Sequence, residues 1–142
     1  MARVRKKVLC IDDHWNGLIS RKMFLESHGY QVLEATGVDE GLQLFRAHSV
    51  DAVVLAYQMP GTNGDVLAAK MKRMKSHVPI LLLSAYGPLP EAKLQSVDTF
   101  LTKSQESKIL LPALQDLLTA RPKPFFNRWF DNWKGRNHTA RH

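Results

Sequence analysis

The sequence predicts an α/β domain in which a five-stranded parallel sheet lies between two layers of helices, a three-layer doubly wound fold. Apolar runs recur at intervals of roughly 20 to 25 residues and predict strands at 8–11, 32–33, 53–56, 80–83 and 100–101. Between them, apolar residues at helical spacing predict helices at 15–28, 38–47, 64–75 and 106–119. Strands that are apolar on both faces and alternate with helices indicate a parallel sheet covered on both sides.

Turn residues support these boundaries and set one connection apart. Gly29 follows the first predicted helix, and Asn63 precedes the third. In the fourth connection, the Gly-Pro-Leu-Pro segment at 87–90 leaves only residues 91 to about 97 for a helix. We therefore expect a short and weakly held fourth helix of about two turns.

The composition fits one domain with basic arms. The 142 residues, 44% of them hydrophobic, suffice for a single core. Of the net charge of +7, residues 1–7 contribute four basic residues and residues 121–142 six basic against one acidic, which leaves the body at −2. We expect a basic arm at 1–5, a folded domain at 6–120 and a basic aromatic tail at 121–142.

The sequence also bears on location. Cys10, the single cysteine, lies inside an apolar run, so we expect a buried thiol and no disulfide. No apolar stretch approaches the length of about 18 residues that a membrane span needs, and the start of the chain does not match a signal peptide. We expect a cytoplasmic protein.

Polar side chains follow the carboxyl ends of the predicted strands, where open parallel sheets bind ligands. Asp12 and Asp13 follow the first strand, Ser84 ends the fourth and Lys103 follows the fifth. Carboxylates are hard oxygen ligands suited to Mg²⁺, while serine and lysine can hold phosphoryl oxygens. The pattern predicts a site for a cation and an anion together.

These residues stand in four motifs that together resemble the response-regulator receiver domain of two-component signalling, over residues 6 to about 119. The motifs are Val8-Leu9-Cys10-Ile11-Asp12-Asp13, Tyr57-Gln58-Met59-Pro60-Gly61-Thr62-Asn63-Gly64, Leu83-Ser84-Ala85 and Phe100-Leu101-Thr102-Lys103. The resemblance implies a flavodoxin-like receiver fold. It also implies phosphoryl transfer from a histidine kinase or phosphotransfer protein to an aspartate of the domain, which then signals to a downstream protein.

The resemblance assigns roles to individual residues. It implies that Asp12, Asp13 and the backbone carbonyl of Gln58 hold Mg²⁺ together with the acceptor aspartate. Ser84 and Lys103 correspond to the positions that contact the phosphoryl group. Phe100 corresponds to the aromatic switch position, without the hydroxyl of the tyrosine often found there.

The chain departs from the family at the central residue. Ala56 stands directly before Tyr57, where the phosphoacceptor aspartate is expected. Because alanine has no nucleophile, phosphoryl transfer to this position is impossible, and we expect no intact catalytic residue and no enzyme activity. Asp51 lies roughly 16 Å away along the strand and cannot replace it. With one carboxylate missing, we expect weak or absent Mg²⁺ binding.

A second departure follows Lys103. The family commonly places a proline there, joined by a cis peptide bond, whereas this chain has Ser104. A cis bond before a residue other than proline costs roughly 2.5 to 4 kcal/mol, so we expect the loop of Lys103 to be set differently. The short fourth helix likewise argues against simple transfer of the family's partner interface.

The tail has an aromatic pattern of its own. Helical spacing over about 124–134 predicts a stripe made of Phe125, Phe126, Trp129, Phe130 and Trp133. This stripe can fold back on the domain, dock on a partner, or lie in an anionic membrane surface, where aromatic and basic residues suit the headgroups. Nucleic acid is disfavoured as a partner, because no DNA-binding fold fits in 22 residues.

Three functions remain open. The chain is a pseudo-receiver that binds partners independently of phosphorylation, an ordinary receiver whose aspartate has been substituted by alanine, or an adaptor directed to a membrane or partner by its tail. The four retained residues Asp12, Asp13, Ser84 and Lys103 slightly favour the second. Because no effector domain follows residue 120, we expect a stand-alone receiver whose output passes through protein contacts.

Overall fold

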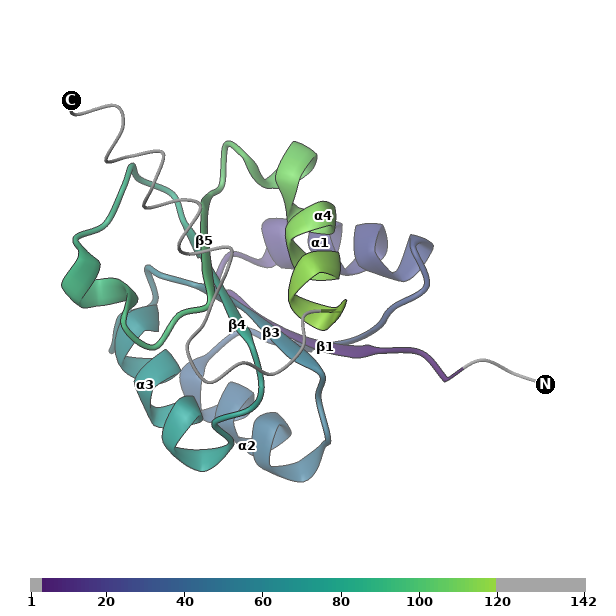
Figure 1. Ribbon diagram of the computed structural model, residues 1–142, viewed down its shortest axis with the longest axis horizontal. Helices are drawn as coiled ribbons and strands as arrows, with labels where there is room; N and C mark the ends of the chain where they lie inside the picture. The colour runs from purple at the N-terminus through teal and green to yellow at the C-terminus, as the bar shows by residue number, and fades with distance from the viewer. Residues whose placement is uncertain (1–3, 120–142) are drawn as a thin grey trace.

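The strands of this chain form a single parallel sheet in the computed structural model, which describes residues 4–119 (Figure 1). The order across the sheet is β2-β1-β3-β4-β5, and all four neighbouring pairs are parallel. The bounds are β1 Lys7–Ile11, β2 Gln31–Ala35, β3 Ala52–Ala56, β4 Ile80–Ser84 and β5 Thr99–Thr102. This confirms the predicted five-stranded parallel sheet and extends each predicted strand by one to three residues.

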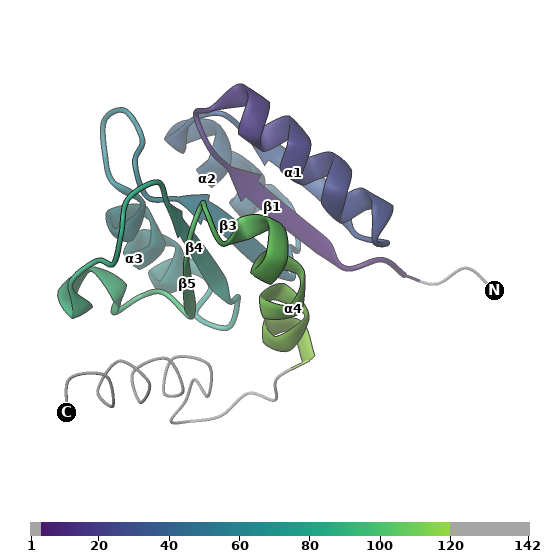
Figure 2. The same cartoon turned by 90° about the horizontal axis from the view of Figure 1, so that it is seen from above.

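Helices cover both faces of the sheet, as the alternating pattern predicts. Figures 1 and 2 show α1 and α4 on one face and α2 and α3 on the other. Their bounds are α1 Trp15–Ser27, α2 Val38–Ala47, α3 Gly64–Met74 and α4 Glu106–Thr119. The end of α1 was predicted from Gly29, which adopts a left-handed φ of 92° while Tyr30 donates to the Leu25 carbonyl over 3.2 Å. Glycine adopts this conformation without the steric cost that a Cβ brings.

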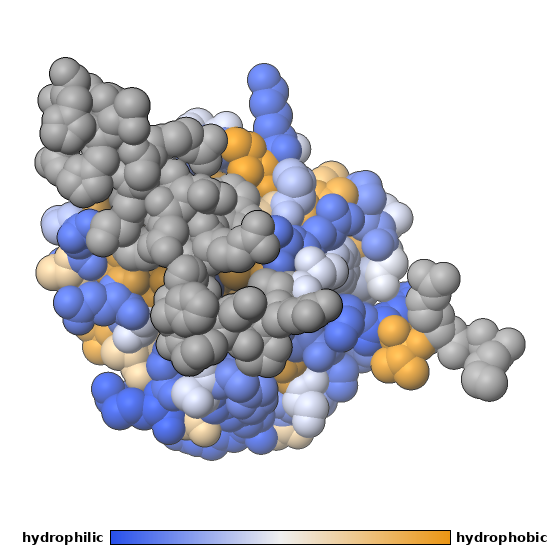
Figure 3. Space-filling model, in the orientation of Figure 1, coloured by the Kyte–Doolittle hydropathy of each residue, from blue (hydrophilic) through white to orange (hydrophobic). Residues whose placement is uncertain are grey.

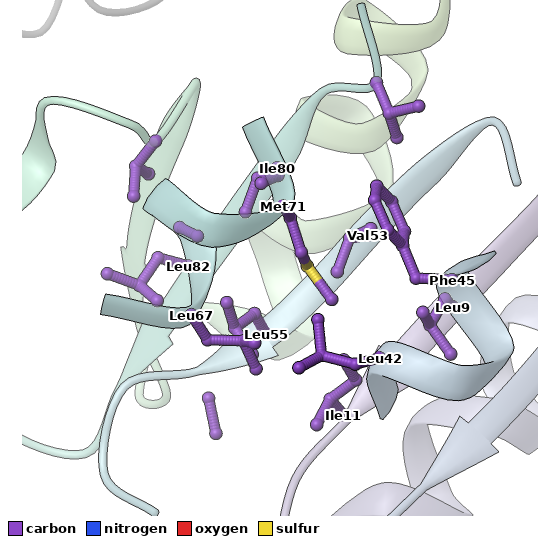
Figure 4. Close-up of a cluster of buried hydrophobic side chains, with 14 of the residues drawn as sticks. Leu9, Ile11, Leu42, Phe45, Val53, Leu55, Leu67, Met71, Ile80 and Leu82 are labelled. Carbon is purple, nitrogen blue, oxygen red and sulfur yellow. The ribbon is translucent and has the colours of Figure 1, made fainter. Parts of the chain in front are cut away.

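Alternation along the strands divides the core into two layers. Leu9 and Ile11 of β1 face α2 and α3, in a cluster that includes Phe45 and Met71 (Figure 4). Val8, Cys10 and their neighbours face α1 and α4. Every residue of β3 and β4 is buried. The sheet is therefore fixed from both sides, and its carboxyl edge is a stable platform for polar side chains.

The helix in the fourth connection, between β4 and β5, is shorter than the predicted two turns. It holds a single 3₁₀ turn, η1 Glu91–Leu94, anchored by the buried side chain of Leu94. Pro90 accepts a hydrogen bond from the Lys93 amide, and Leu94 accepts one from Val97. Because β5 already begins at Thr99, the segment after Pro90 is too short for a stable helix of several turns.

Within residues 4–119, no helix is long and apolar enough to cross a membrane. In the view of Figure 3, hydrophilic side chains dominate the surface over α2 and α3. The predicted aromatic helix at 124–134 falls outside the described residues.

Candidate functional site

Strand pairing brings the predicted site residues to one edge of the sheet. Ala56 ends β3 and pairs with Leu83, the residue before Ser84. The Lys103 amide donates to the Ser84 carbonyl over 2.8 Å, which joins the ends of β4 and β5. Asp12, Ser84 and Ala56 are all buried. The carboxyl edge of the sheet therefore holds a carboxylate, a hydroxyl and a lysine, next to the end of the strand that Ala56 closes.

The Asp12 carboxylate is the centre of this arrangement. Its Oδ1 accepts the backbone N–H of His14 at 2.9 Å. Its Oδ2 accepts a hydrogen bond from Lys103 Nζ at 2.9 Å and a longer one from Arg21 Nη1 at 3.3 Å. Since a buried carboxylate is stable only when it is paired, two cations and one amide together account for its burial.

Arg21 is a site residue that the sequence patterns did not single out. Its side chain is only 1% exposed, and it forms a two-point contact with Glu106, with Nε to Oε2 at 2.6 Å and Nη2 to Oε1 at 3.2 Å. Burial lowers the pKa of Arg21, but the hydrogen bond and charge of Glu106, together with the charges of Cys10 and Asp12, raise it above its ordinary value overall. The spacing of Leu18, Arg21 and Leu25, all buried in α1, is the signal that places an arginine on the inner stripe of the helix.

The two predicted acidic residues after β1 differ in burial. Asp13 is exposed, whereas Asp12 is fully buried with both oxygens engaged. In the part of the chain that the structure describes, no three or more His, Cys, Asp or Glu side chains are grouped so that they could hold a metal ion. Mg²⁺ favours a near-octahedral set of oxygen ligands. The buried carboxylate that could contribute to such a set, that of Asp12, is paired with Arg21 and Lys103 instead.

Gln58 contributes its side chain as well as the carbonyl that the resemblance singles out. Its Nε2 donates to Ser84 Oγ over 3.3 Å, and its Oε1 accepts the Ala85 N–H over 3.2 Å. Ser84 Oγ also accepts the Tyr86 N–H over 3.1 Å. The hydroxyl of Ser84 is therefore engaged within the protein, in a loop that Gln58 closes from the next strand.

A glycine sets the path of the loop after β3. The Gly64 amide, which opens α3, donates to the Tyr57 carbonyl over 2.6 Å. A Cβ at Gly64 would overlap the Ala56 carbonyl oxygen and approach Leu82 Cδ1 at 2.8 Å. Only glycine lets α3 begin this close to the end of β3.

The loop after β5 holds Lys103 without a cis peptide bond. Residues 4–119 contain no cis bond, and Lys103 nevertheless reaches Asp12. Side chains stabilise the loop, since Gln105 Oε1 accepts the Thr102 N–H at 2.9 Å and the hydroxyls of Thr102 and Ser104 lie 2.9 Å apart. Phe100 is partly buried and packs against the core layer of α2 and α3.

Comparisons with known proteins agree with this fold. The family model described as the response regulator receiver domain matches residues 8–115. The chain is 30% identical over 125 residues to the transcriptional regulatory protein GlrR of Escherichia coli K12, covering 86% of this chain and 28% of that protein. It is 26% identical to the protein PilH of Pseudomonas aeruginosa over 117 residues, covering 79% of this chain and 97% of PilH.

Solved structures give the same result. The response regulator TrrA of Thermotoga maritima, solved in complex with Mg²⁺ and BeF, is 29% identical with a TM-score of 0.75, covering 80% of this chain and 99% of TrrA. TrrA has also been solved in complex with the histidine kinase ThkA, with the same similarity to this chain. This chain therefore belongs to the response regulator receiver family, with the flavodoxin-like receiver fold.

Proposed function

We propose that this chain is a two-component receiver that signals through protein contacts without accepting a phosphoryl group at position 56. The observation that carries the proposal is that the buried residue Ala56 ends β3, at the sheet edge where Asp12, Ser84 and Lys103 also lie. In the family pattern that position supplies the attacking carboxylate. Lys103, which would hold a phosphoryl oxygen, is instead paired with Asp12 at 2.9 Å.

A phosphorylation assay tests this proposal. The chain and its Ala56→Asp variant are incubated with Mg²⁺ and a small phosphodonor, and acid-labile phosphate is followed by intact mass. The Ala56→Asp variant is expected to take up one phosphoryl group and the unsubstituted chain none. Uptake by the unsubstituted chain, mapped to any residue of this site, would overturn the proposal. The natural codon at position 56 decides whether the alanine is inherited or was introduced into an ordinary receiver.

Weak or absent Mg²⁺ binding is part of the proposal. Asp12, Asp13 and the Gln58 carbonyl are the ligands that the family pattern retains, and a carboxylate at position 56 is missing. The exposure of Asp13 and the pairing of Asp12 with cations support this view. When bound in receivers, Mg²⁺ neutralises the charge of the transferring phosphoryl group, a role that has no counterpart at a methyl group.

The partners follow from the same reading. TrrA binds the histidine kinase ThkA, and we propose that this chain likewise contacts a histidine kinase or phosphotransfer protein and a downstream protein in the cytoplasm. Since the chain spans only about a quarter of GlrR, the activity of such longer relatives is not transferred to it. We propose that residues 6–120 form the receiver domain and residues 121–142 its tail.

An adaptor role for the tail is the second candidate. The aromatic residues Phe125, Trp129 and Trp133 stand at helical spacing among basic residues, a composition that suits anionic membrane surfaces. Sedimentation with anionic and with neutral liposomes, using chains that end at Ala120 and at His142, tests it. Binding of only the longer chain to anionic liposomes supports the adaptor, and equal binding of both chains contradicts it.

A further inference from the structure

Four charged side chains form a connected network of ion pairs that extends from the end of β1 to the start of α4. Asp12 directly follows β1, Arg21 lies in α1, Glu106 opens α4 and Lys103 precedes it. The carboxylates of Asp12 and Glu106 are balanced by the two cations, and Arg21 contacts both carboxylates. Nothing in the proposed signalling role requires a guanidinium in this position.

The placement of Arg21 is specific. Its Nη1 lies 3.3 Å from the Asp12 Oδ2 atom that also accepts from Lys103. Gly17, one turn earlier in α1, lies beside this pair, since a Cβ there would meet Arg21 Nη2 at 3.8 Å and Asp12 Oδ2 at 4.0 Å, both ordinary contact distances. Side chains of a helix point back toward its N-terminus, which directs Arg21 toward the carboxyl edge of the sheet.

Burial makes this arrangement costly unless its charges are matched. The side chains of Arg21 and Asp12 are 1% and 0% exposed, and an unpaired buried charge costs several kcal/mol. A divalent cation beside Asp12 would face the positive charges of Arg21 and Lys103 at short range. Two positive charges repel strongly where water is excluded, so Arg21 and a metal ion compete for the same carboxylate.

We propose that Arg21 is a built-in cation of this receiver, which takes the electrostatic place of a metal ion at Asp12 and ties α1 to the start of α4 through Glu106. The proposal deepens the proposed function, on which it rests only for the location of the site. It has a specific consequence. Restoring the carboxylate with Ala56→Asp is not sufficient for tight Mg²⁺ binding as long as Arg21 is present.

The tie to Glu106 also explains how the loop of Lys103 is held. Glu106 is three residues after Lys103 and receives two hydrogen bonds from Arg21, whose helix is 85 residues away in sequence. Bidentate pairs of arginine and carboxylate are among the stronger and more directional polar contacts. Arg21 therefore ties α1 to the first residue of α4, directly after the loop in which Ser104 stands in place of proline.

The test compares Mg²⁺ affinity in full-length chains, by calorimetric titration, between Ala56→Asp and the double variant Ala56→Asp with Arg21→Met. Methionine keeps much of the arginine stem volume and removes the charge. The matched control is Ala56→Asp with Lys22→Met, which removes a positive charge from the next residue of α1, where Lys22 pairs with Glu34 near the surface. Circular dichroism confirms that each variant is folded.

We expect Arg21→Met to tighten Mg²⁺ binding by about tenfold or more, because a neighbouring positive charge is removed, and Lys22→Met to change it little. Equal affinities of Ala56→Asp and its folded Arg21→Met variant would overturn the proposal. This measurement is independent of the phosphorylation assay. Phosphoryl uptake by the unsubstituted chain would overturn the proposed function, but it would not change the comparison of Mg²⁺ affinities between the two Ala56→Asp variants.

A second measurement applies if Arg21→Met does not fold. The side-chain Nε–H signal of Arg21 is followed by NMR in Ala56→Asp during addition of Mg²⁺. A shift of this signal on binding, or its retention with no Mg²⁺ bound, supports competition for Asp12. Binding of Mg²⁺ with an unchanged Arg21 signal contradicts it.

Discussion

Gln58, in the loop after β3, and Ser84, at the end of β4, are joined by a hydrogen bond of 3.3 Å from the amide Nε2 to the hydroxyl Oγ. The same amide accepts the N–H of Ala85 through its oxygen. One side chain thus satisfies both the hydroxyl and the backbone of the loop after β4. We call these two hydrogen bonds the Gln58 clamp, and they join the loop after β3 to the loop after β4.

Truncating this clamp is expected to loosen the loop. Gln58→Ala removes two hydrogen bonds, each contributing about 1 kcal/mol at most when partly exposed. Amide hydrogen exchange of Ala85 and Tyr86 should accelerate, while that of the core strands stays the same. Gln95→Ala, at an exposed glutamine after η1, serves as the control. Unchanged exchange of Ala85 in Gln58→Ala would show that the clamp does not restrain the loop.

Restoring the carboxylate is expected to destabilise the metal-free domain. Ala56 is 2% exposed, so Ala56→Asp places a buried charge near Asp12, and two such charges repel by roughly 4 kcal/mol at about 4 Å. Because Lys103 offsets part of this repulsion, we expect a loss of about 2 kcal/mol in the free energy of unfolding, measured with urea in the presence of a chelator.

The control for this prediction is Ala56→Asn, which has the same shape without the charge. It should cost less than Ala56→Asp in the absence of metal. If the two variants unfold at the same urea concentration, charge repulsion is not the cause of the loss.

Gly64 is expected to tolerate no side chain. A Cβ there overlaps the carbonyl oxygen of Ala56, a backbone atom that cannot rotate away. Gly64→Ala should therefore lower the free energy of unfolding by about 2 kcal/mol or more, since α3 must shift from the end of β3. Gly87→Ala, where a Cβ meets nothing within 4 Å, should stay within about 0.5 kcal/mol of the unsubstituted chain. Similar losses in both would rule out the close approach as the cause.

Cys10 gives the stability a defined dependence on pH. Burial raises the pKa of its thiol from 9.0 to about 12, and the nearby charge of Arg21 offsets only part of that rise. Between these values the unfolded chain loses the thiol proton while the folded chain keeps it. The folded state then binds more protons, so the contribution of Cys10 to stability falls by about 1.4 kcal/mol per pH unit above about pH 9.

Urea unfolding at several pH values checks this slope. The difference in stability between the unsubstituted chain and Cys10→Ala should shrink as the pH rises from about 8 to about 10.5, with the slope set by the linkage. Cys10→Val also lacks a thiol, so its stability should depend on pH in the same way as that of Cys10→Ala. A difference that stays constant over this range would show that the thiol ionises as readily in the folded as in the unfolded chain.

The fold and part of the site were predictable because their causes are local. Apolar runs such as that of β3 specify strands, and Gly29 specifies the end of α1 through its positive φ. Asp12, Ser84 and Lys103 meet because parallel strands end at one edge of the sheet. The length of η1 was overestimated, because the short segment between Pro90 and the start of β5 at Thr99 forms too few hydrogen bonds to hold two turns.

The sequence by itself determined the succession of strands and helices along the chain, the sheet edge where the polar residues gather and the absence of a carboxylate at position 56. Only the tertiary structure decided which partners those residues have. Arg21 and Glu106 are 85 residues apart, and their pairing depends on the packing of α1 and α4 on the same face of the sheet (Figure 1). Periodicity shows that a side chain faces inward, but the charge it meets there depends on segments distant in the chain.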